Sequence, residues 1–147
     1  MRVLIDADAC PVVNLAVSLC RRYAIPCLLL CDTAHQIQRE GAETLVFDKG
    51  ADSVDFALVN LVQAGDLVIT QDYGLASMCL ARNAQVLHQD GWAYTEWNIS
   101  GLLEQRHAAR KFRAAGGRTK GPAKRTEVQN SAFVRALETL LQHAVQG

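Results

Sequence analysis

Short apolar runs alternate with amphipathic segments from the start of the chain to His88. The runs are rich in Val, Leu and Ile, which is typical of buried strands, and the intervening segments repeat apolar residues at helical spacing. The predicted strands cover residues 2–5, 26–31, 44–47, 67–70 and 84–87. The predicted helices cover residues 12–23, 53–62 and 74–82. Strands alternating with helices indicate βαβ units, so we expect an α/β fold: a doubly wound, mainly parallel sheet of about five strands with helices on both faces.

The pattern changes after His88. Residues 91–100 contain both tryptophans and are predicted to be extended. Residues 101–113 indicate a basic helix, and residues 115–125, which are rich in Gly and lack large apolar side chains, indicate a mobile loop. A last helix is predicted over residues 127–145. Its apolar stripe should dock on the body and consists of Val134, Leu137, Leu140 and Leu141.

The length of 147 residues and the hydrophobic content of 50% fit one globular domain. We divide it into an α/β body (1–100), a basic helix and loop (101–127) and a C-terminal helix (128–147). No apolar stretch is long enough to cross a membrane, and the first residues do not resemble a signal peptide. The five cysteines include no Cys-x-x-Cys pair, which favours buried thiols over disulfides or a zinc site. We therefore expect a cytoplasmic protein without membrane contact, and the sequence leaves a homodimer open.

The zero net charge conceals an uneven distribution. Residues 1–100 hold twelve of the fifteen acidic residues and only six of the fifteen basic ones. Eight basic residues gather in the segment 101–127: Arg106, Arg110, Lys111, Arg113, Arg118, Lys120, Lys124 and Arg125. Such asymmetry points to a polyanionic partner, RNA rather than DNA in our interpretation. The alternative is a solvated face that keeps the protein soluble.

Aspartates recur where a parallel sheet would bring them together. Asp6 and Asp8 follow the first strand, Asp52 and Asp55 open a helix, and Asp72 follows the strand 67–70. In an open α/β sheet, ligands bind outside the carboxyl ends of the strands, so these side chains are expected to share one crevice. Two of them have a simpler explanation, because Asp8 can cap the helix entered at Pro11 and Asp52 can cap its own helix.

Three further aspartates are set aside. Asp48 and Asp90 are interpreted as turn residues, and Asp66 precedes a strand and so lies at the opposite edge of the sheet. The four histidines share no metal-ligand spacing, so the predicted site is made of carboxylate oxygens alone. Such a site suits Mg²⁺ or Mn²⁺ and phosphodiester hydrolysis.

Other motifs add little. The chain contains no Gly-x-Ser-x-Gly, Gly-x-Gly-x-x-Gly or Gly-x-x-x-x-Gly-Lys pattern, which argues against serine hydrolase, dinucleotide-binding and P-loop chemistry. Three aromatic residues, Trp92, Tyr94 and Trp97, can stack on nucleobases or belong to the core. We favour a position in the core or at an interface for two of the three.

Several motifs together resemble one bacterial family. These are Asp6-Ala7-Asp8-Ala9-Cys10-Pro11-Val12, the run from Gly50 to Asp55, the run from Gly65 to Ala76, and Gly121-Pro122. The chain resembles the YaiI/YqxD family over nearly its whole length, and that family is regarded as related to the PIN-like nucleases. The resemblance implies a PIN-like fold and a metal-dependent ribonuclease. In this comparison Asp6 matches the first-strand aspartate, Asp52 or Asp55 the acidic residue of the middle helix, and Asp72 the one after the fourth strand.

Three functions stay in competition. The leading hypothesis is a nuclease that uses Mg²⁺ or Mn²⁺, with catalytic residues Asp6, Asp8, Asp55 and Asp72, and with Asp52 as a further metal ligand. A phosphatase of the haloacid dehalogenase type would use Asp6 as a covalent nucleophile, but the later lysine and second acidic pair that it needs are not evident. The third hypothesis is a non-catalytic module that binds nucleic acid or a partner. Fold alone does not decide among them.

Overall fold

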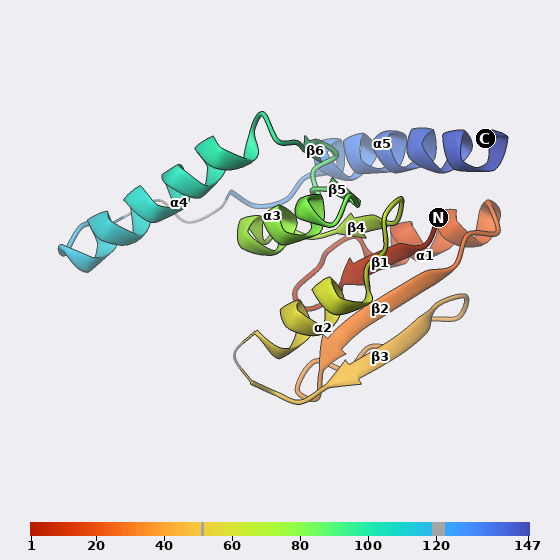
Figure 1. Cartoon of the computed structure of the whole chain (residues 1–147), viewed down its shortest axis with the longest axis horizontal. Helices are drawn as coiled ribbons and strands as arrows, with labels where there is room; N and C mark the ends of the chain where they lie inside the picture. The colour runs from red at the N-terminus through yellow and green to blue at the C-terminus, as the bar shows by residue number, and fades with distance from the viewer. Residues whose placement is uncertain (51, 119–122) are drawn as a thin grey trace.

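A six-stranded β-sheet forms the centre of the computed structural model, which describes residues 1–50, 52–118 and 123–147 (Figure 1). The strand order across the sheet is β3-β2-β1-β4-β5-β6. The first five strands are parallel, and β6 is antiparallel to β5. The bounds are β1 (Val3–Asp6), β2 (Cys27–Asp32), β3 (Glu43–Phe47), β4 (Leu67–Ile69), β5 (Gln85–Leu87) and β6 (Ala93–Tyr94).

The central strand β1 determines where a site can form. Its residues Val3, Leu4 and Ile5 are fully buried, as expected for a strand covered on both faces. It pairs with β2 on one side and β4 on the other, so the chain reverses its direction of winding between β1 and β4. Ligands of doubly wound proteins bind at this switch point, outside the carboxyl ends of the strands.

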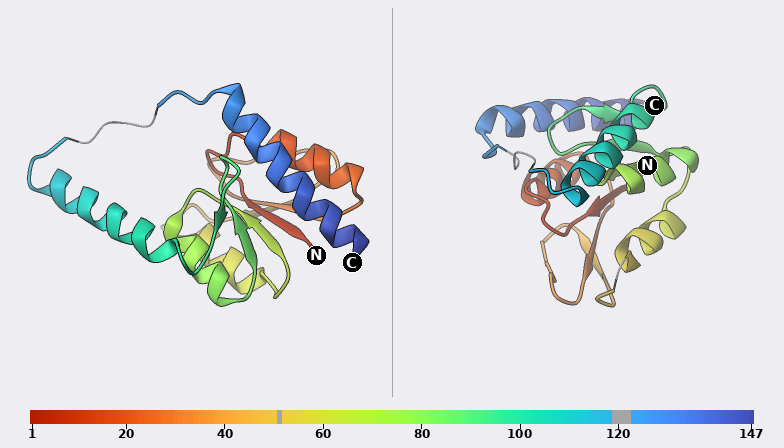
Figure 2. Two further views of the ribbon diagram at one scale, coloured as in Figure 1. Left: turned by 90° about the horizontal axis from the view of Figure 1, so that it is seen from above. Right: turned by 90° about the vertical axis from the view of Figure 1, so that its left-hand side faces the viewer.

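Helices cover both faces of the sheet (Figures 1 and 2). One hydrophobic cluster joins the sheet to α1 (Val13–Arg22) and α5 (Glu127–Gln146), and a second joins it to α2 (Ser53–Leu61) and α3 (Tyr73–Ala81). The predicted α/β class and doubly wound, mainly parallel sheet are confirmed. The arrangement is compatible with the PIN-like fold that the resemblance implied.

The C-terminal helix α5 docks on the body beside α1, as predicted. Its fully buried residues are Phe133, Leu137 and Leu141, whereas Val134 and Leu140 of the predicted stripe are only partly buried. The helix begins with a capping box in which Thr126 and Gln129 each accept a backbone N–H bond, which satisfies two donors at the helix start. The buried stripe of α5 thus includes Phe133 and is turned slightly about the helix axis from the predicted one.

Helix α4 (Ile99–Ala114) differs from the others because it extends away from the body at the carboxyl edge of the sheet (Figure 2). It contacts α3, and among the described residues of α4 it is Ile99 and Leu102, in the first turn, that pack against a core cluster. Over all its described residues, α4 has none that is fully buried. Its packing on the core is therefore concentrated at its N-terminal end.

Some details of the prediction needed correction. The sheet has six strands rather than about five, because Ala93–Tyr94, too short to show a periodic pattern, adds to the edge. Helix α1 begins at Val13, so Pro11 lies in the preceding turn instead of the helix. Residues 119–122 of the predicted mobile loop lie outside the described residues.

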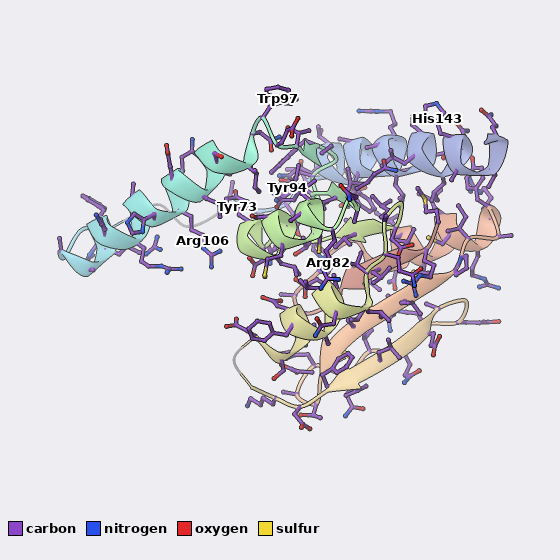
Figure 3. The ribbon with its side chains drawn as sticks, viewed as in Figure 1. Tyr73, Arg82, Tyr94, Trp97, Arg106 and His143 are labelled. Atoms are coloured by element: carbon purple, nitrogen blue, oxygen red, sulfur yellow. The ribbon has the colours of Figure 1, made fainter. Side chains whose placement is uncertain are left out.

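Buried thiols and aromatic side chains follow the sequence expectation. All five cysteines are free and four of them are buried. Trp92 stacks on His88 with ring centroids 4.3 Å apart, and Tyr94 packs edge-on against both rings. Trp97 is 86% exposed and points out of the molecule (Figure 3). Two of the three aromatic residues therefore serve packing.

In the part of the chain that the structure describes, no helix is long and apolar enough to span a bilayer.

Candidate metal centre

A cleft of ≈ 250 Å³ opens at the carboxyl edge of the sheet, at the switch point between β1 and β4. All five aspartates singled out in the sequence line it, and Asp32 joins them. The remaining lining residues are Gly50, Ser53, Val54 and Gln71. The described lining residues carry six carboxylates and no lysine or arginine, so the cleft is strongly anionic.

Asp6 ends β1 and is the most buried of these carboxylates. Its Oδ2 accepts a hydrogen bond from the hydroxyl of Thr70 at 2.9 Å. Burial raises the pKa of Asp6 from 3.8 to about 6, and the charges of Asp72 and Asp8 add to the rise, while the Thr70 bond opposes it. Near neutral pH, the ionised form of Asp6 is thus disfavoured by its own surroundings.

Helix α2 contributes two aspartates from its first turn. Asp55 is half-buried and its pKa is raised to about 6, first by burial and then by the charges of Asp72, Asp6 and Asp52. Asp52 stands at the N-cap position with a left-handed backbone (φ 65°), but its side chain accepts no capping bond from the described residues. Capping therefore does not account for Asp52, contrary to the simpler reading of the sequence.

Asp72 does cap a helix. Its Oδ1 accepts bonds from the backbone N–H groups of Gly74 (2.9 Å) and Leu75 (3.1 Å) at the start of α3. The same oxygen lies 3.4 Å from Nη1 of Arg106, which comes from α4. The backbone N–H of Asp72 donates to the Thr70 hydroxyl, which in turn donates to Asp6. Thr70 thereby links the two aspartates that follow neighbouring parallel strands.

Asp8 faces the other end of the cleft. It makes no cap for α1, whose N-cap is Val12, and its Oδ1 is a buried atom without a hydrogen-bond partner among the described residues. One ligand atom each from Asp8, Asp32 and His35 lies within 4.8 Å of the other two. Burial and the charge of Asp32 raise the pKa of Asp8, whereas the hydrogen bond from His35 lowers that of Asp32.

Two residues at this end of the cleft, Asp32 and His35, were not singled out in the sequence. Asp32 ends β2 in the way that Asp6 ends β1, so the strand-end rule that found Asp6 also applies to it. His35 lies 2.8 Å from Asp32 in the following turn, and its distance of 4.0 Å from Asp8 could not be inferred from spacing. An imidazole nitrogen thus adjoins the carboxylates at this end of the cleft, next to a site that the sequence predicted to consist of carboxylate oxygens.

The eight basic residues of the predicted nucleic-acid surface lie in different surroundings. Arg106 borders the cleft, and Arg110 lies one turn further along α4. Arg125 is held within the body, where it donates to Asp90 (2.6 Å), to the carbonyl oxygen of Gln89 (2.7 Å) and to Asn130 (2.7 Å). Lys120 lies outside the described residues, and the other four are exposed, namely Lys111, Arg113, Arg118 and Lys124.

The aspartates set aside in the sequence lie outside the cleft. Asp66 binds Arg2 at the opposite edge of the sheet, with Oδ2 2.8 Å from the guanidinium, which confirms its exclusion. Asp90 holds Arg125, so it does more than form a turn. Asp48 is exposed and does not line the cleft.

The fold and the cleft together define a class: a doubly wound α/β protein with a carboxylate-lined crevice at its switch point. Within that class the chain belongs to the family described as "Uncharacterized BCR, YaiI/YqxD family", whose profile matches residues 4–143.

Relatives from several bacteria match almost end to end, and each carries the name "UPF0178 protein". The chain is 50% identical to one from Exiguobacterium sibiricum over 141 residues, covering 96% of both chains. It is 42% identical to one from Ruminiclostridium cellulolyticum, over 100% of this chain and 96% of the relative. It is 40% identical to one from Enterococcus faecalis, over 99% of this chain and 100% of the relative. No solved structure matches the chain.

Proposed function

We propose that this protein is a divalent-metal-dependent nuclease that acts on RNA. The observation that carries the proposal is the convergence of Asp6, Asp55 and Asp72 in one cleft at the switch point, with Asp8 and Asp52 beside them. These side chains come from two strand ends and one helix start. Carboxylates brought together in this way repel one another unless a cation lies between them.

The donor set fits a hard divalent cation. Carboxylate oxygens are the ligands that Mg²⁺ and Mn²⁺ prefer. The burial of Asp6 and the raised pKa values of Asp6 and Asp55 indicate that Arg106 beside Asp72 and His35 beside Asp8 compensate only part of the negative charge of the cleft. We assign Asp6, Asp55 and Asp72 as the principal ligands, and Asp8 and Asp52 as further ones. Bound Mg²⁺ or Mn²⁺ supplies activation of water and stabilisation of a phosphate oxygen.

The protein's own residues then fix the arrangement. Thr70 holds the Asp6 carboxylate through its hydroxyl, and the two N–H bonds at the start of α3 hold Oδ1 of Asp72. These three contacts hold both carboxylates at the cleft that they line. Positioned oxygens of this kind are what a hydrolytic metal site requires.

The nuclease is favoured over the two other hypotheses. A phosphatase of the haloacid dehalogenase type needs a lysine beside its nucleophile, and no lysine is among the described residues that line the cleft. A non-catalytic module, in which the carboxylates are structural or bind metal without turnover, would not require the fixed positions that Thr70 and the start of α3 give to Asp6 and Asp72. RNA as the substrate is supported by the basic residues of α4, because phosphate contacts dominate the affinity of nucleic-acid binding.

A cleavage assay on labelled RNA tests the proposal. The wild-type protein should cleave with Mn²⁺ or Mg²⁺ and stop cleaving in EDTA. Asp6→Asn should lower the rate by roughly a hundredfold or more, because it removes one charge from the proposed metal position without changing the shape of the side chain. Calorimetric titration with Mn²⁺ should show binding to the wild type that is lost in Asp6→Asn.

Asp48→Asn is the matched control, since Asp48 is an exposed aspartate outside the cleft. This variant should bind Mn²⁺ and cleave RNA like the wild type. Cleavage that persists in EDTA or in Asp6→Asn would contradict the proposal. RNA binding without cleavage under any of these metals would instead favour the non-catalytic module.

A further inference from the structure

The cleft continues into two further hollows that lead along α4. The first, of ≈ 370 Å³, is lined by Gln71, Asp72, Tyr73 and Arg106, and it shares Gln71 and Asp72 with the cleft. The second, of ≈ 310 Å³, is lined by Leu103, Arg106, His107 and Arg110, and it shares Arg106 with the first. Each hollow shares lining residues with the next, so the cleft and the two hollows adjoin one another. We call the two hollows along α4 the α4 groove.

The sign of the charge changes along this path. The cleft is lined by carboxylates, whereas the α4 groove carries the guanidinium groups of Arg106 and Arg110. These two residues are four apart on a helix, so they lie on the same face, about 6 Å apart along the axis. A cation site that is followed at once by two arginines suits a ligand with successive phosphates, one at the metal and the next along α4.

The present partner of Arg106 is a weak one. Its Nη1 lies 3.4 Å from Oδ1 of Asp72, longer than a strong charge-assisted bond, and the two side chains are 43% and 32% exposed. Exposed pairs of this kind contribute little to stability, so Arg106 can change partner at small cost. Asp72 keeps its two bonds from Gly74 and Leu75 on the same oxygen when Arg106 leaves.

Tyr73 adds an aromatic surface to the first hollow, which it lines together with Asp72 and Arg106. It is partly buried, and its ring packs edge-on against Tyr94 with centroids 5.9 Å apart. Figure 3 shows Arg106 directed from α4 toward the start of α3, where Tyr73 lies. A ring held in this way offers a stacking surface for a base whose phosphate lies on the arginines.

We infer that the α4 groove holds the phosphates of a single RNA strand next to the cleft, and that Arg106 positions this strand by exchanging Asp72 for a phosphate. The inference rests on the proposed function for the choice of RNA. Hollows of this volume have the size of small-ligand sites, which suits the nucleotides of one strand rather than a duplex. Arg106 is a positioning residue and Arg110 its neighbour on the path.

Binding without metal tests this inference separately from cleavage. Fluorescence anisotropy would measure the affinity of the protein in EDTA for a labelled single-stranded RNA of about 12 nucleotides, within the usual site size. Arg106→Ala should weaken binding roughly tenfold. It should also flatten the log–log salt dependence by about 0.7, the change expected for one phosphate contact. Arg106→Lys should restore part of the affinity.

Arg135→Ala is the matched control, because Arg135 is an exposed arginine on α5, away from the α4 groove. It should leave affinity and salt slope unchanged. Equal binding by Arg106→Ala and Arg135→Ala, absence of binding by the wild type, or equal affinity for a duplex of the same length would overturn the inference. A loss specific to Arg106→Ala would support it even if no cleavage were ever detected, so failure of the nuclease proposal is distinguishable.

Discussion

At the scale of single residues, Asp6 and Asp55 are the cleft carboxylates whose pKa values rise to about 6, and Asp6 is the more buried of the two. A rise in pKa from 3.8 to about 6 means that the folded protein holds a proton more tightly at Asp6 than the unfolded chain does. In the metal-free protein, Asp6 therefore contributes stability below its unfolded pKa, and that contribution is lost as the pH rises through about 6. The shift corresponds to a cost of about 3 kcal/mol at neutral pH.

Asp6→Asn should accordingly stabilise the metal-free protein. The amide oxygen of Asn keeps an acceptor for Thr70 while the charge is removed, so we expect the free energy of unfolding in EDTA to rise by roughly 1–3 kcal/mol at about pH 7.5. The difference from wild type should shrink as the pH falls through about 6 and vanish near pH 4. Urea unfolding at a series of pH values measures it. A difference in stability that does not vary with pH would show that the ionisation of Asp6 is not its cause.

At the scale of elements, Asp72 combines two roles in one side chain, because it both caps α3 and faces the cleft. Comparison of two variants separates the roles. Asp72→Asn and Asp72→Ala both remove the charge, but only the alanine removes the acceptor for the N–H groups of Gly74 and Leu75. We expect Asp72→Ala to be less stable than Asp72→Asn by about 1 kcal/mol in urea unfolding without metal. Equal stabilities of the two variants would mean that the Asp72 cap contributes nothing to the free energy of unfolding.

Much of the candidate site could be predicted at this scale. Carboxyl ends of parallel strands share one edge, so the aspartates after β1 and β4 could be brought together from the sequence alone. The same rule covers Asp32, which directly follows the predicted strand 26–31 but was not singled out. Strand β6 escaped prediction because two residues carry no period.

The contact of Arg106 with Asp72 could not be predicted from the sequence. It depends on the angle at which α4 leaves the body, and that angle is set by the packing of Ile99 and Leu102 on the second core cluster. The composition of the basic segment gives no indication of this angle. Local sequence thus predicted a basic helix and left its direction undetermined.

At the scale of the whole molecule, Arg125 ties the start of α5 to the loop after β5. Its side chain is only 20% exposed and it donates to Asp90, Gln89 and Asn130. In the sequence this residue was grouped with the nucleic-acid surface, as part of one continuous run of positive charge. The structure instead places its guanidinium in a network that joins two segments distant in the chain.

Arg125→Ala should therefore destabilise the protein. Its loss leaves the Asp90 carboxylate and a carbonyl oxygen without their donor, so we expect a decrease of about 1–3 kcal/mol in the free energy of unfolding. Lys124→Ala, at the exposed neighbouring position, should change it by less than about 0.5 kcal/mol. Thermal and urea unfolding of the two variants provide the comparison. Similar stabilities would show that the Arg125 network is dispensable.

The packing of the first turn of α4 on the second core cluster has a consequence for hydrogen exchange. Backbone amides of β1, which is paired on both sides and fully covered, exchange only when the whole molecule opens, whereas amides beyond the first turn of α4 exchange through local fraying. The side of the α4 groove that Gln71, Asp72 and Tyr73 form lies next to the covered sheet, whereas the side that α4 forms opens more readily. A ligand in that groove would slow exchange along α4 directly, and it would slow exchange in β1 as well, because binding to the folded molecule alone lowers the population of the globally opened state.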